Sequence, residues 1–374
     1  MKSVVIAGYV RSPFCFAGKG ELAKIRADDM AAAVVRALVM RSKLDPALIE
    51  DLIVGCAFPE GEQGLNVARL IGFLADLPLG VAGMTVNRFC GSSMQSIHIA
   101  AGAIQLGAGE AFICAGVESM SRIPMSGFNP MPNPELAERM QAAYMGMGQT
   151  AENVARLYKI SRKEQEEFAV ISQQRAATAQ AAGKLTEEIT PVGGVTADGC
   201  IRADTNAAKL AELKLAFDEK GSVTAGTASP LTDGAAATLV TSEEFARKHQ
   251  LPILARIKSV AVAGCAPEIM GIGPVAATQK ALQRAGLTVK DLDIIELNEA
   301  FASQSLACIR DLGLDQAKIN IDGGAIALGH PLGATGARIT GKAAVLLKRE
   351  GKRYALATQC IGGGQGIATI LEAV

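Results

Sequence analysis

Cys90 is the residue of this sequence whose type and setting most favour covalent chemistry. It lies in the segment 87–95, NRFCGSSMQ, between a strand-like apolar stretch and a helix-like one whose apolar residues recur at three- and four-residue spacing. A thiol at a helix start faces unpaired backbone N–H groups and the positive end of the helix dipole. Because that setting favours the reactive thiolate, we expect Cys90 to be a nucleophile. The alternative is a buried cysteine that acts as a small hydrophobic residue.

Of the three histidines, His330 is the one placed to act as a base for this thiol. It lies in the glycine-rich segment 322–333, DGGAIALGHPLG, which follows a strand-like stretch and precedes a helix-like one. His98 lies inside the helix that follows Cys90, and His249 lies in a charged turn, so packing or surface roles are favoured for both. A cysteine paired with a histidine is a common way to activate a thiol.

Two further segments could complete a site. Cys360 opens the turn 360–366, CIGGGQG, where backbone N–H groups can approach a ligand closely enough to form an oxyanion hole. A second thiol beside such donors could move a proton at carbon. Asn298, in the segment 298–302 (NEAFA), either caps a helix or presents a carboxamide that holds a water molecule or a donor in the site. The glycine turns do not match the dinucleotide fingerprint, so a nicotinamide-dependent oxidoreductase is disfavoured.

The elements that must position these residues form a repeat with an offset of 243 residues. Leu44 corresponds to Leu287, and each lies between a helix-like segment and an apolar, strand-like one. Further along the chain the same offset places His330 and Cys90 at nearly equivalent positions of the two halves. We therefore expect two α/β halves related by a pseudo-twofold axis, each a sheet flanked by helices, with these two residues at a shared cleft.

The segment between the halves has a different composition. Residues 119–229 are richer in Pro, Met and charged residues, and they contain a helix-like stretch over 150–180 whose mostly polar face includes Glu152 and Arg156. We expect an inserted loop domain that covers the substrate, since such insertions on a rigid scaffold often carry function. A dimerisation loop or a decorative loop is the alternative.

The length of 374 residues is too great for one ordinary core. We expect an N-terminal half over 1–118, completed by 230–250, then the insertion over 119–229 and a C-terminal half over 251–374. The 37 basic residues balance the 37 acidic ones, which disfavours a general nucleic-acid or membrane surface. The first apolar stretch is too short for a secretory signal, and the eight cysteines lack zinc-site spacing. We expect a cytoplasmic protein without a metal.

Four segments, taken together and in this order, resemble the motifs of the thiolase family along the whole chain. They are residues 87–95, 298–302, 323–331 and 360–366. The resemblance implies the thiolase fold, a five-layered α-β-α-β-α core of duplicated α/β halves with an inserted loop domain. That architecture agrees with the repeat and the insertion inferred from the residues themselves.

The resemblance also implies a role for each candidate catalytic residue. Cys90 would take the acyl group as a thioester, and His330 would accept the thiol proton. Asn298 would hold a water molecule that completes an oxyanion hole with His330. Cys360 would act as acid and base at the substrate α-carbon, and the N–H groups of Cys90 and Gly362 would form a second oxyanion hole.

Four substrate-binding residues follow from the same resemblance. Ser229 would contact CoA, Met147 would lie over the pantetheine, and Phe301 would lie near the acyl group. Lys214 stands where many members have an arginine near the nucleotide, so it keeps the charge but not the planar fork. CoA and acyl-CoA would be the substrates, and no cofactor would be needed.

The implied reaction is reversible, CoA-dependent thiolytic cleavage of a 3-oxoacyl-CoA to acetyl-CoA and a shortened acyl-CoA, as in fatty-acid β-oxidation. The segment 265–271 resembles the bacterial degradative branch, the 3-ketoacyl-CoA thiolases, and Gly146 stands where biosynthetic members usually carry a histidine. A biosynthetic acetyl-CoA acetyltransferase that makes acetoacetyl-CoA is the alternative. A non-catalytic scaffold subunit is disfavoured, because both cysteines and the histidine are present. The resemblance implies a homodimer or homotetramer and leaves open a β-oxidation partner subunit.

Overall fold

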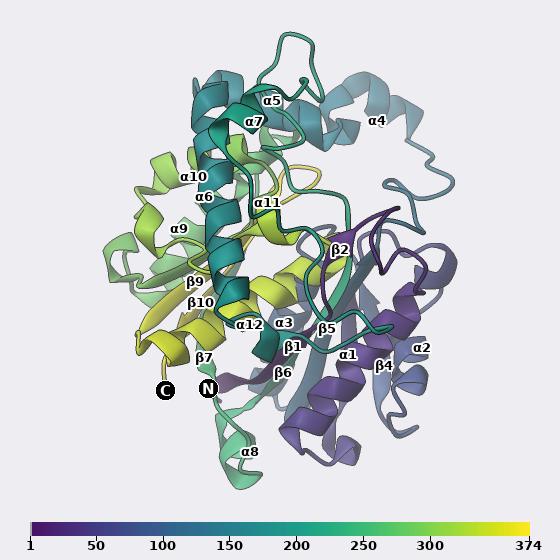
Figure 1. The fold of residues 1–374 in the computed structure, drawn as a ribbon. Coiled ribbons are helices and arrows are strands. Elements are labelled where there is room, and N and C mark those ends of the chain that lie inside the picture. The colour runs from purple at the N-terminus through teal and green to yellow at the C-terminus, as the bar shows by residue number, and fades with distance from the viewer. Residues whose placement is uncertain (1) are drawn as a thin grey trace.

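The computed structural model describes residues 2–374 and shows strands with helices packed on both sides (Figure 1). Within that range ten strands are joined by hydrogen bonds in the order β4-β3-β5-β6-β1-β7-β10-β9-β8, with β2 paired to β6. The strands are β1 (Val4–Arg11), β2 (Cys15–Phe16), β3 (Asp51–Gly55), β4 (Ala82–Val86), β5 (Ala111–Ser119), β6 (Thr232–Ser242), β7 (Ala255–Gly264), β8 (Ile294–Leu297), β9 (Tyr354–Ile361) and β10 (Gln365–Glu372).

The strand order confirms the predicted duplication. On one side of the junction between β1 and β7 the order is β3-β5-β6-β1, and on the other side β7-β10-β9-β8 is its counterpart in reverse. The pairs β3–β5 and β8–β9 are parallel, whereas β5–β6 and β9–β10 are antiparallel. β1 and β7 meet only through the pairs Val5–Arg256 and Ile6–Ala255. The pseudo-twofold axis therefore relates the strands on the two sides of this short junction, and the strands on each side form the sheet of one half.

Helices form three layers around the two sheets and complete the predicted five-layered arrangement (Figure 1). In the middle layer, α3 (Ser92–Leu106) packs against α12 (Leu332–Glu350), which contacts strands of both halves. The outer layers are α1 (Ala27–Ser42) with α2 (Val67–Leu74), and α9 (Gly273–Ala285) with α10 (Ala302–Leu312). The other helices are α4 (Pro134–Arg139), α5 (Met147–Leu157), α6 (Arg162–Ala181), α7 (Ala207–Ala211), α8 (Glu243–Lys248) and α11 (Ala325–Leu328).

Glycines hold the start of α12 close against β5. A Cβ on Gly116 of β5 would collide with the carbonyl oxygen of Gly333 on α12, and a Cβ on Gly333 would collide with the carbonyl oxygen of Val117. Since both partners are backbone atoms, neither contact could be relieved by a side-chain rotation. The helix that follows His330 is therefore fixed against the N-terminal sheet.

The insertion between β5 and β6 differs from the prediction in two details. The expected continuous helix over 150–180 is wrong, because α5 and α6 are separate helices and Ser161 forms a capping box with Glu164 at the start of α6. A capping box satisfies backbone N–H groups at the start of a new helix. Glu152 does not lie on a solvated face, since it is 1% exposed and its carboxylate accepts the N–H of Ser222.

After the insertion, the chain returns to the first half. β6 pairs with both β5 and β1, so it belongs to the N-terminal sheet. β5 ends at Ser119, one residue past the predicted end of the first unit. The division into 1–118 with 230–250, 119–229 and 251–374 stays a prediction. None of the described helices combines the length and the apolar character needed to cross a membrane.

Candidate active site

Cys90 lies in the turn between β4 and α3, as the sequence predicts. The Ser92 hydroxyl, at the start of α3, accepts the N–H of Arg88 and donates to the carbonyl of Phe89, which closes the turn. Phe89 has a φ of 43°, a left-handed conformation that costs energy in a residue other than glycine. From the other half of the molecule, the side-chain amide of Gln359 on β9 donates to the carbonyl of Cys90. Contacts from both halves thus hold the candidate nucleophile.

Burial determines the protonation state of the Cys90 thiol. The residue is 9% exposed, and burial raises the pKa of its thiol to about 11, although the N–H groups of Gly362 and of Cys90 itself act to lower it. The charge of Glu118 adds to the upward shift of the pKa. The prediction that Cys90 is a thiolate is therefore wrong for the free protein. The cost of desolvating the thiolate outweighs its stabilisation by the N–H groups at the helix start.

His330 lies between α11 and α12 and is 4% exposed. Its Nε2 is 3.3 Å from the Nδ2 of Asn298, and its Nδ1 is 2.6 Å from the Thr335 hydroxyl. Burial, together with the nearby charge of Arg338, lowers the pKa of His330 to about 3. The imidazole is therefore neutral at physiological pH, which leaves one ring nitrogen able to accept a proton.

Cys90 and His330 lie near the starts of the two paired helices of the middle layer. Cys90 lies two residues before the start of α3, His330 lies two residues before the start of α12, and these two helices pack against each other. Leu332, at the start of α12, belongs to the same hydrophobic cluster as Cys90. The two residues are thus brought to one region, although no hydrogen bond joins the Cys90 sulfur to the His330 ring within residues 2–374.

Asn298 follows β8 directly and is fully buried. Its side chain does not cap a helix, because α10 begins at Ala302 with Phe301 as its N-cap and without a capping side-chain hydrogen bond. Its Nδ2 faces His330, and its Oδ1 has no hydrogen-bond partner among the described residues. A buried amide oxygen without a protein partner is a suitable acceptor for a water molecule.

Cys360 lies at the end of β9, next to the glycine turn that joins β9 to β10. It is 1% exposed and packs in one apolar cluster with Phe301 and Met147. Burial raises the pKa of its thiol well above the ordinary value, and ionisation of the nearby Cys90 would raise it further. The second cysteine is thus a neutral thiol close to the first.

The predicted CoA-binding residues are placed unequally. Ser229 donates its backbone N–H to the carbonyl of Ala300, which brings it next to Phe301 and the Cys360 cluster. Lys214 is exposed on the loop after α7. No group of three or more His, Cys, Asp or Glu side chains gathers as a metal site would require, over the part of the chain that the structure describes.

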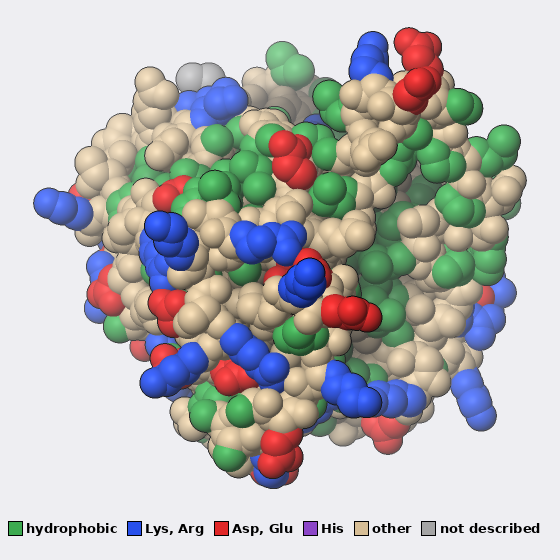
Figure 2. Space-filling model, turned by 90° about the horizontal axis from the view of Figure 1, so that it is seen from above, with side chains coloured by type: hydrophobic (Ala, Val, Ile, Leu, Met, Phe, Trp, Pro, Cys, Tyr) green, Lys and Arg blue, Asp and Glu red, His purple; other side chains and the backbone are tan. Residues whose placement is uncertain are grey.

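A cavity of about 530 Å³ opens beside Cys90. Most of its lining is apolar, and it comes from the loop after β3, the nucleophile turn, the insertion and the glycine turn. The lining residues are Ala57, Phe58, Pro59, Glu60, Asn87, Phe89, Cys90, Met125, Ser126, Pro130, Met131, Pro132, Ala143, Tyr144, Met145, Gly146, Met147, Leu332, Gly362 and Gly363. Figure 2 looks down on the top of Figure 1 and shows a hollow lined mainly by hydrophobic side chains, with acidic and basic groups intermixed around it.

Glu118 is a buried residue near the site that the sequence analysis did not single out. Its carboxylate accepts hydrogen bonds from the N–H groups of Ala57 and Gly333 at 2.8 and 2.9 Å, and from the side chain of Gln63 at 2.8 Å. It therefore ties the loop after β3 to the start of α12. A carboxylate at the end of the otherwise apolar segment 111–117 is the signal that could have revealed it.

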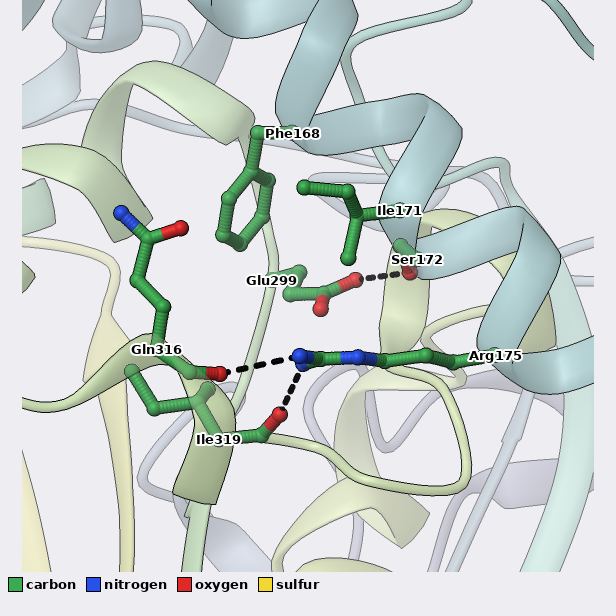
Figure 3. A pocket seen from close by; sticks show the side chains of 7 residues that line it. All are labelled: Phe168, Ile171, Ser172, Arg175, Glu299, Gln316 and Ile319. Carbon is green, nitrogen blue, oxygen red and sulfur yellow. Dashed lines mark hydrogen bonds between the residues drawn. The ribbon is translucent and has the colours of Figure 1, made fainter.

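Glu299, the residue after Asn298, lines a small pocket together with Ser172 and Arg175 of α6 (Figure 3). Its carboxylate is buried and accepts hydrogen bonds from the Ser172 hydroxyl at 2.6 Å and from the side chain of Asn320 at 2.7 Å. It also accepts the N–H of Ile326, at the start of α11. Glu299 thus anchors the turn that carries Asn298 to α6 and to the loop before His330.

Comparisons with known proteins agree with this geometry. The family model for the thiolase N-terminal domain matches residues 4–244, and the model for the thiolase C-terminal domain matches residues 251–373. The chain is 50% identical over 388 residues to a protein of Shewanella denitrificans named 3-ketoacyl-CoA thiolase, and 46% identical over 389 residues to one of Bacillus subtilis with the same name. Both alignments cover 100% of each chain.

Solved structures give the same result. The crystal structure of human mitochondrial 3-ketoacyl-CoA thiolase superposes with a TM-score of 0.91 at 38% identity and covers 100% of this chain and 99% of that chain. The crystal structure of the same human enzyme in complex with CoA gives a TM-score of 0.92 at 39% identity, over 100% of this chain and 98% of that chain. The predicted resemblance and the predicted fold are confirmed. This chain belongs to the thiolase family.

Proposed function

We propose that this chain catalyses CoA-dependent thiolytic cleavage of a 3-oxoacyl-CoA to acetyl-CoA and a shortened acyl-CoA. The observation that carries the proposal is that Cys90 lines an apolar cavity together with Leu332 and Met147. Leu332 follows His330, which is paired with Asn298, and Met147 packs against Cys360. Similarity over the full chain to proteins named 3-ketoacyl-CoA thiolase supports it.

The first step is attack by Cys90 on the 3-oxo carbon. The Cys90 thiol gives its proton to the free nitrogen of His330 as the new S–C bond forms, since both groups are neutral in the free protein. The C2–C3 bond then breaks, and its electron pair passes to the α-carbon of the departing acetyl-CoA. The Cys360 thiol protonates that carbon, which leaves an acyl-enzyme at Cys90 and a thiolate at Cys360.

The second step returns the enzyme to its starting state. A second CoA thiol gives its proton to the Cys360 thiolate and attacks the thioester at Cys90, which releases the shortened acyl-CoA. The Cys90 sulfur leaves with the bonding electron pair and recovers its proton from His330. Backbone N–H groups of Cys90 and Gly362 that act on the sulfur, and a water held on the free Oδ1 of Asn298, are suitable donors for the negative oxygen of each step.

The size and lining of the cavity favour the degradative reaction over the biosynthetic one. An acetoacetyl group needs room for one methyl group beyond the 3-oxo carbon, whereas the cavity beside Cys90 encloses about 530 Å³ with a mostly apolar wall. Each methylene group that an apolar wall removes from water stabilises the bound substrate by about 0.8 kcal/mol. We therefore assign the cavity to an acyl chain longer than that of acetoacetyl-CoA.

The CoA part of the substrate is assigned to the side of the cavity at which Met147 packs against Cys360. Met147, which packs against Cys360, is assigned to the pantetheine, and Phe301 of the same cluster is assigned to the acyl group. Ser229, whose N–H donates to the carbonyl of Ala300, is assigned to CoA. Lys214 is exposed and is assigned to the nucleotide phosphates as a mobile cation. CoA and acyl-CoA act as substrates, and the reaction balances without a metal or a redox cofactor.

We also propose a cytoplasmic homo-oligomer. All eight cysteines are unpaired, as expected in a reducing compartment. A homodimer is the smallest such assembly, and the free edge strand β4, which has a neighbour on one side only, is the candidate interface. A homotetramer or a β-oxidation partner subunit would need a second surface.

The test is a profile of thiolysis rate against acyl-chain length, with 3-oxoacyl-CoA substrates of four to sixteen carbons. A matched pair of variants sharpens it: Ala143→Trp fills the cavity from its outer wall, whereas Ala142→Trp changes the neighbouring residue, which does not line the cavity. We expect Ala143→Trp to lower kcat/KM for long chains at least ~10-fold, or ~1.4 kcal/mol, and to spare the four-carbon substrate. Activity confined to four carbons in the unmodified protein would contradict the degradative assignment.

A further inference from the structure

Thr335 contacts the ring nitrogen of His330 that faces away from Asn298. It lies in the first turn of α12 and is fully buried. Its hydroxyl oxygen is 2.6 Å from the Nδ1 of His330 and 2.9 Å from the carbonyl oxygen of Pro331. A hydroxyl group carries a single proton, so it can donate to only one of these two neighbours.

The carbonyl of Pro331 can only accept a hydrogen bond. The backbone N–H of Thr335 also donates to this carbonyl, at 3.0 Å, so the helix geometry fixes the oxygen beneath the hydroxyl. A threonine hydroxyl in a helix commonly donates to the carbonyl four residues earlier. When the Thr335 proton points to Pro331, its oxygen must accept, and the hydrogen between Thr335 and His330 must belong to Nδ1.

The opposite nitrogen of the ring agrees with this assignment. The Nε2 of His330 is 3.3 Å from the Nδ2 of Asn298, and an amide nitrogen is a donor only. A protonated Nε2 would place two donors against each other inside the protein. The hydroxyl of Thr335 and the amide nitrogen of Asn298 therefore both favour the neutral form with its proton on Nδ1.

We infer that Thr335 is a positioning residue that holds His330 in the Nδ1–H tautomer, with an unprotonated Nε2 that takes the Cys90 proton in place of its long, 3.3 Å contact with Asn298. In the other tautomer Nε2 already carries a proton and cannot take one from Cys90. Loss of the outer hydrogen-bond partner of a metal-ligating histidine typically lowers activity or affinity about 10- to 100-fold, and we expect a loss of similar size for a histidine that acts as a base. The kinetic consequence rests on the proposed thiolase reaction, but the tautomer is a property of the free protein.

The test combines ¹⁵N NMR of histidine side chains with single-turnover acetylation of Cys90 by acetyl-CoA. The chain has three histidines, so labelling with ¹⁵N-histidine gives few ring signals, and His98→Gln and His249→Gln assign them. The variants are Thr335→Val, which removes the hydroxyl at similar shape, and Thr335→Ser, which keeps it. Thr340→Val is the matched control, because Thr340 is a buried threonine of α12 that donates to the carbonyl of Gly336 and does not contact a histidine.

We expect His330 to carry its proton on Nδ1 in the unmodified protein, in Thr335→Ser and in Thr340→Val, and to lose that preference in Thr335→Val. Acetylation of Cys90 should slow ~10- to 100-fold in Thr335→Val alone, with the KM for acetyl-CoA unchanged. A proton on Nε2 in the unmodified protein overturns the inference, even if Thr335→Val does not fold. An altered tautomer without slower acetylation overturns the positioning role. The predicted tautomer in a protein without thiolase activity refutes the proposed function instead.

Discussion

At the scale of single residues, the site is a set of neutral groups rather than a preformed ion pair. Burial raises the pKa of the Cys90 thiol to about 11 and lowers the pKa of His330 to about 3. Each pKa unit corresponds to about 1.4 kcal/mol, so separation of charge between the two groups is strongly unfavourable in the free protein. Proton transfer must therefore accompany bond formation to a bound substrate. The buried site thus limits reaction of the thiol with other electrophiles until a substrate is in place.

The raised pKa of Cys90 has a measurable consequence for its reactivity. Below its pKa a thiol gains tenfold in thiolate for each pH unit, and only the thiolate is alkylated. We expect the rate of Cys90 alkylation by iodoacetamide to rise throughout pH 7–10 without a plateau, as measured by mass spectrometry of the peptide that contains Cys90. A synthetic peptide of residues 87–95 is the control and should level off above its ordinary pKa, about 8.5. A plateau below pH 8 in the folded protein would show that the helix start outweighs burial.

At the scale of secondary-structure elements, the repeat made much of the fold predictable. The helices α1 and α9 and the strands β3 and β8 lie where the 243-residue offset places them, because apolar periodicity and turn residues are local features. The break between α5 and α6 was missed, although the S-x-x-E spacing of Ser161 and Glu164 was present in the sequence. The partners of Glu118 could not be predicted, because its contact with Gly333 joins segments 215 residues apart. The contact of Thr335 with His330 spans only five residues, but it depends on how the loop enters α12 and on the rotamers of both side chains.

The contact between β5 and α12 gives a prediction at this scale. Gly116→Ala would place a methyl group against the carbonyl oxygen of Gly333, so β5 and the start of α12 would have to separate. Overpacking of this kind costs about 1–3 kcal/mol of unfolding free energy. Because the same helix start carries His330, we expect thiolysis to fall together with stability, as followed by urea denaturation and initial rates.

Gly102→Ala is the matched control for this substitution. Gly102 lies inside α3, and a Cβ there would meet no atom within 4 Å. Replacing a helical glycine by alanine at an open position stabilises a protein by about 0.4–1 kcal/mol. Equal stability of the two variants would show that β5 and α12 have more freedom to separate than the close contact indicates.

At the scale of the whole molecule, a chain of buried ion pairs joins the first strand, the insertion and the C-terminal half. Arg11 of β1 binds Glu188 and Asp198 of the insertion at 2.7 and 2.6 Å. Lys342 of α12 binds Glu188 at 3.0 Å and Asp322 at 2.8 Å. Charges this deeply buried are tolerated only when they are paired, so removing one leaves its partner unpaired and costly. The network therefore makes the relative position of the three parts specific, and the catalytic residues depend on that position.

The two outer edges of the sheets differ in whether another segment of the chain covers them. The edge at β8 is covered, because the segment at Ile319 forms a parallel bridge with Ile295 and the side chain of Asn320 donates to the carbonyl of Leu297. The edge at β4 has no strand beside it among the described residues, and Met84 on it is 36% exposed. An open edge with apolar neighbours is a template for pairing with another chain.

A second copy of the chain is the partner that fits this edge, since a twofold axis can pair a strand antiparallel with itself. The exposed apolar side chains near it are Phe73, Leu74, Leu79 and Met84. We expect the unmodified protein to sediment as a dimer or a larger assembly, and Met84→Asp to weaken the dimer at least ~10-fold, because two like charges would be buried at the axis. Met40→Asp is the control, because Met40 is 66% exposed at the end of α1 and its substitution should leave the assembly unchanged.

A tetramer reduced to a dimer by Met84→Asp would reveal a second interface. An unchanged assembly would place the interface away from β4, because neither an edge ladder nor an apolar contact centred on Met84 tolerates paired carboxylates.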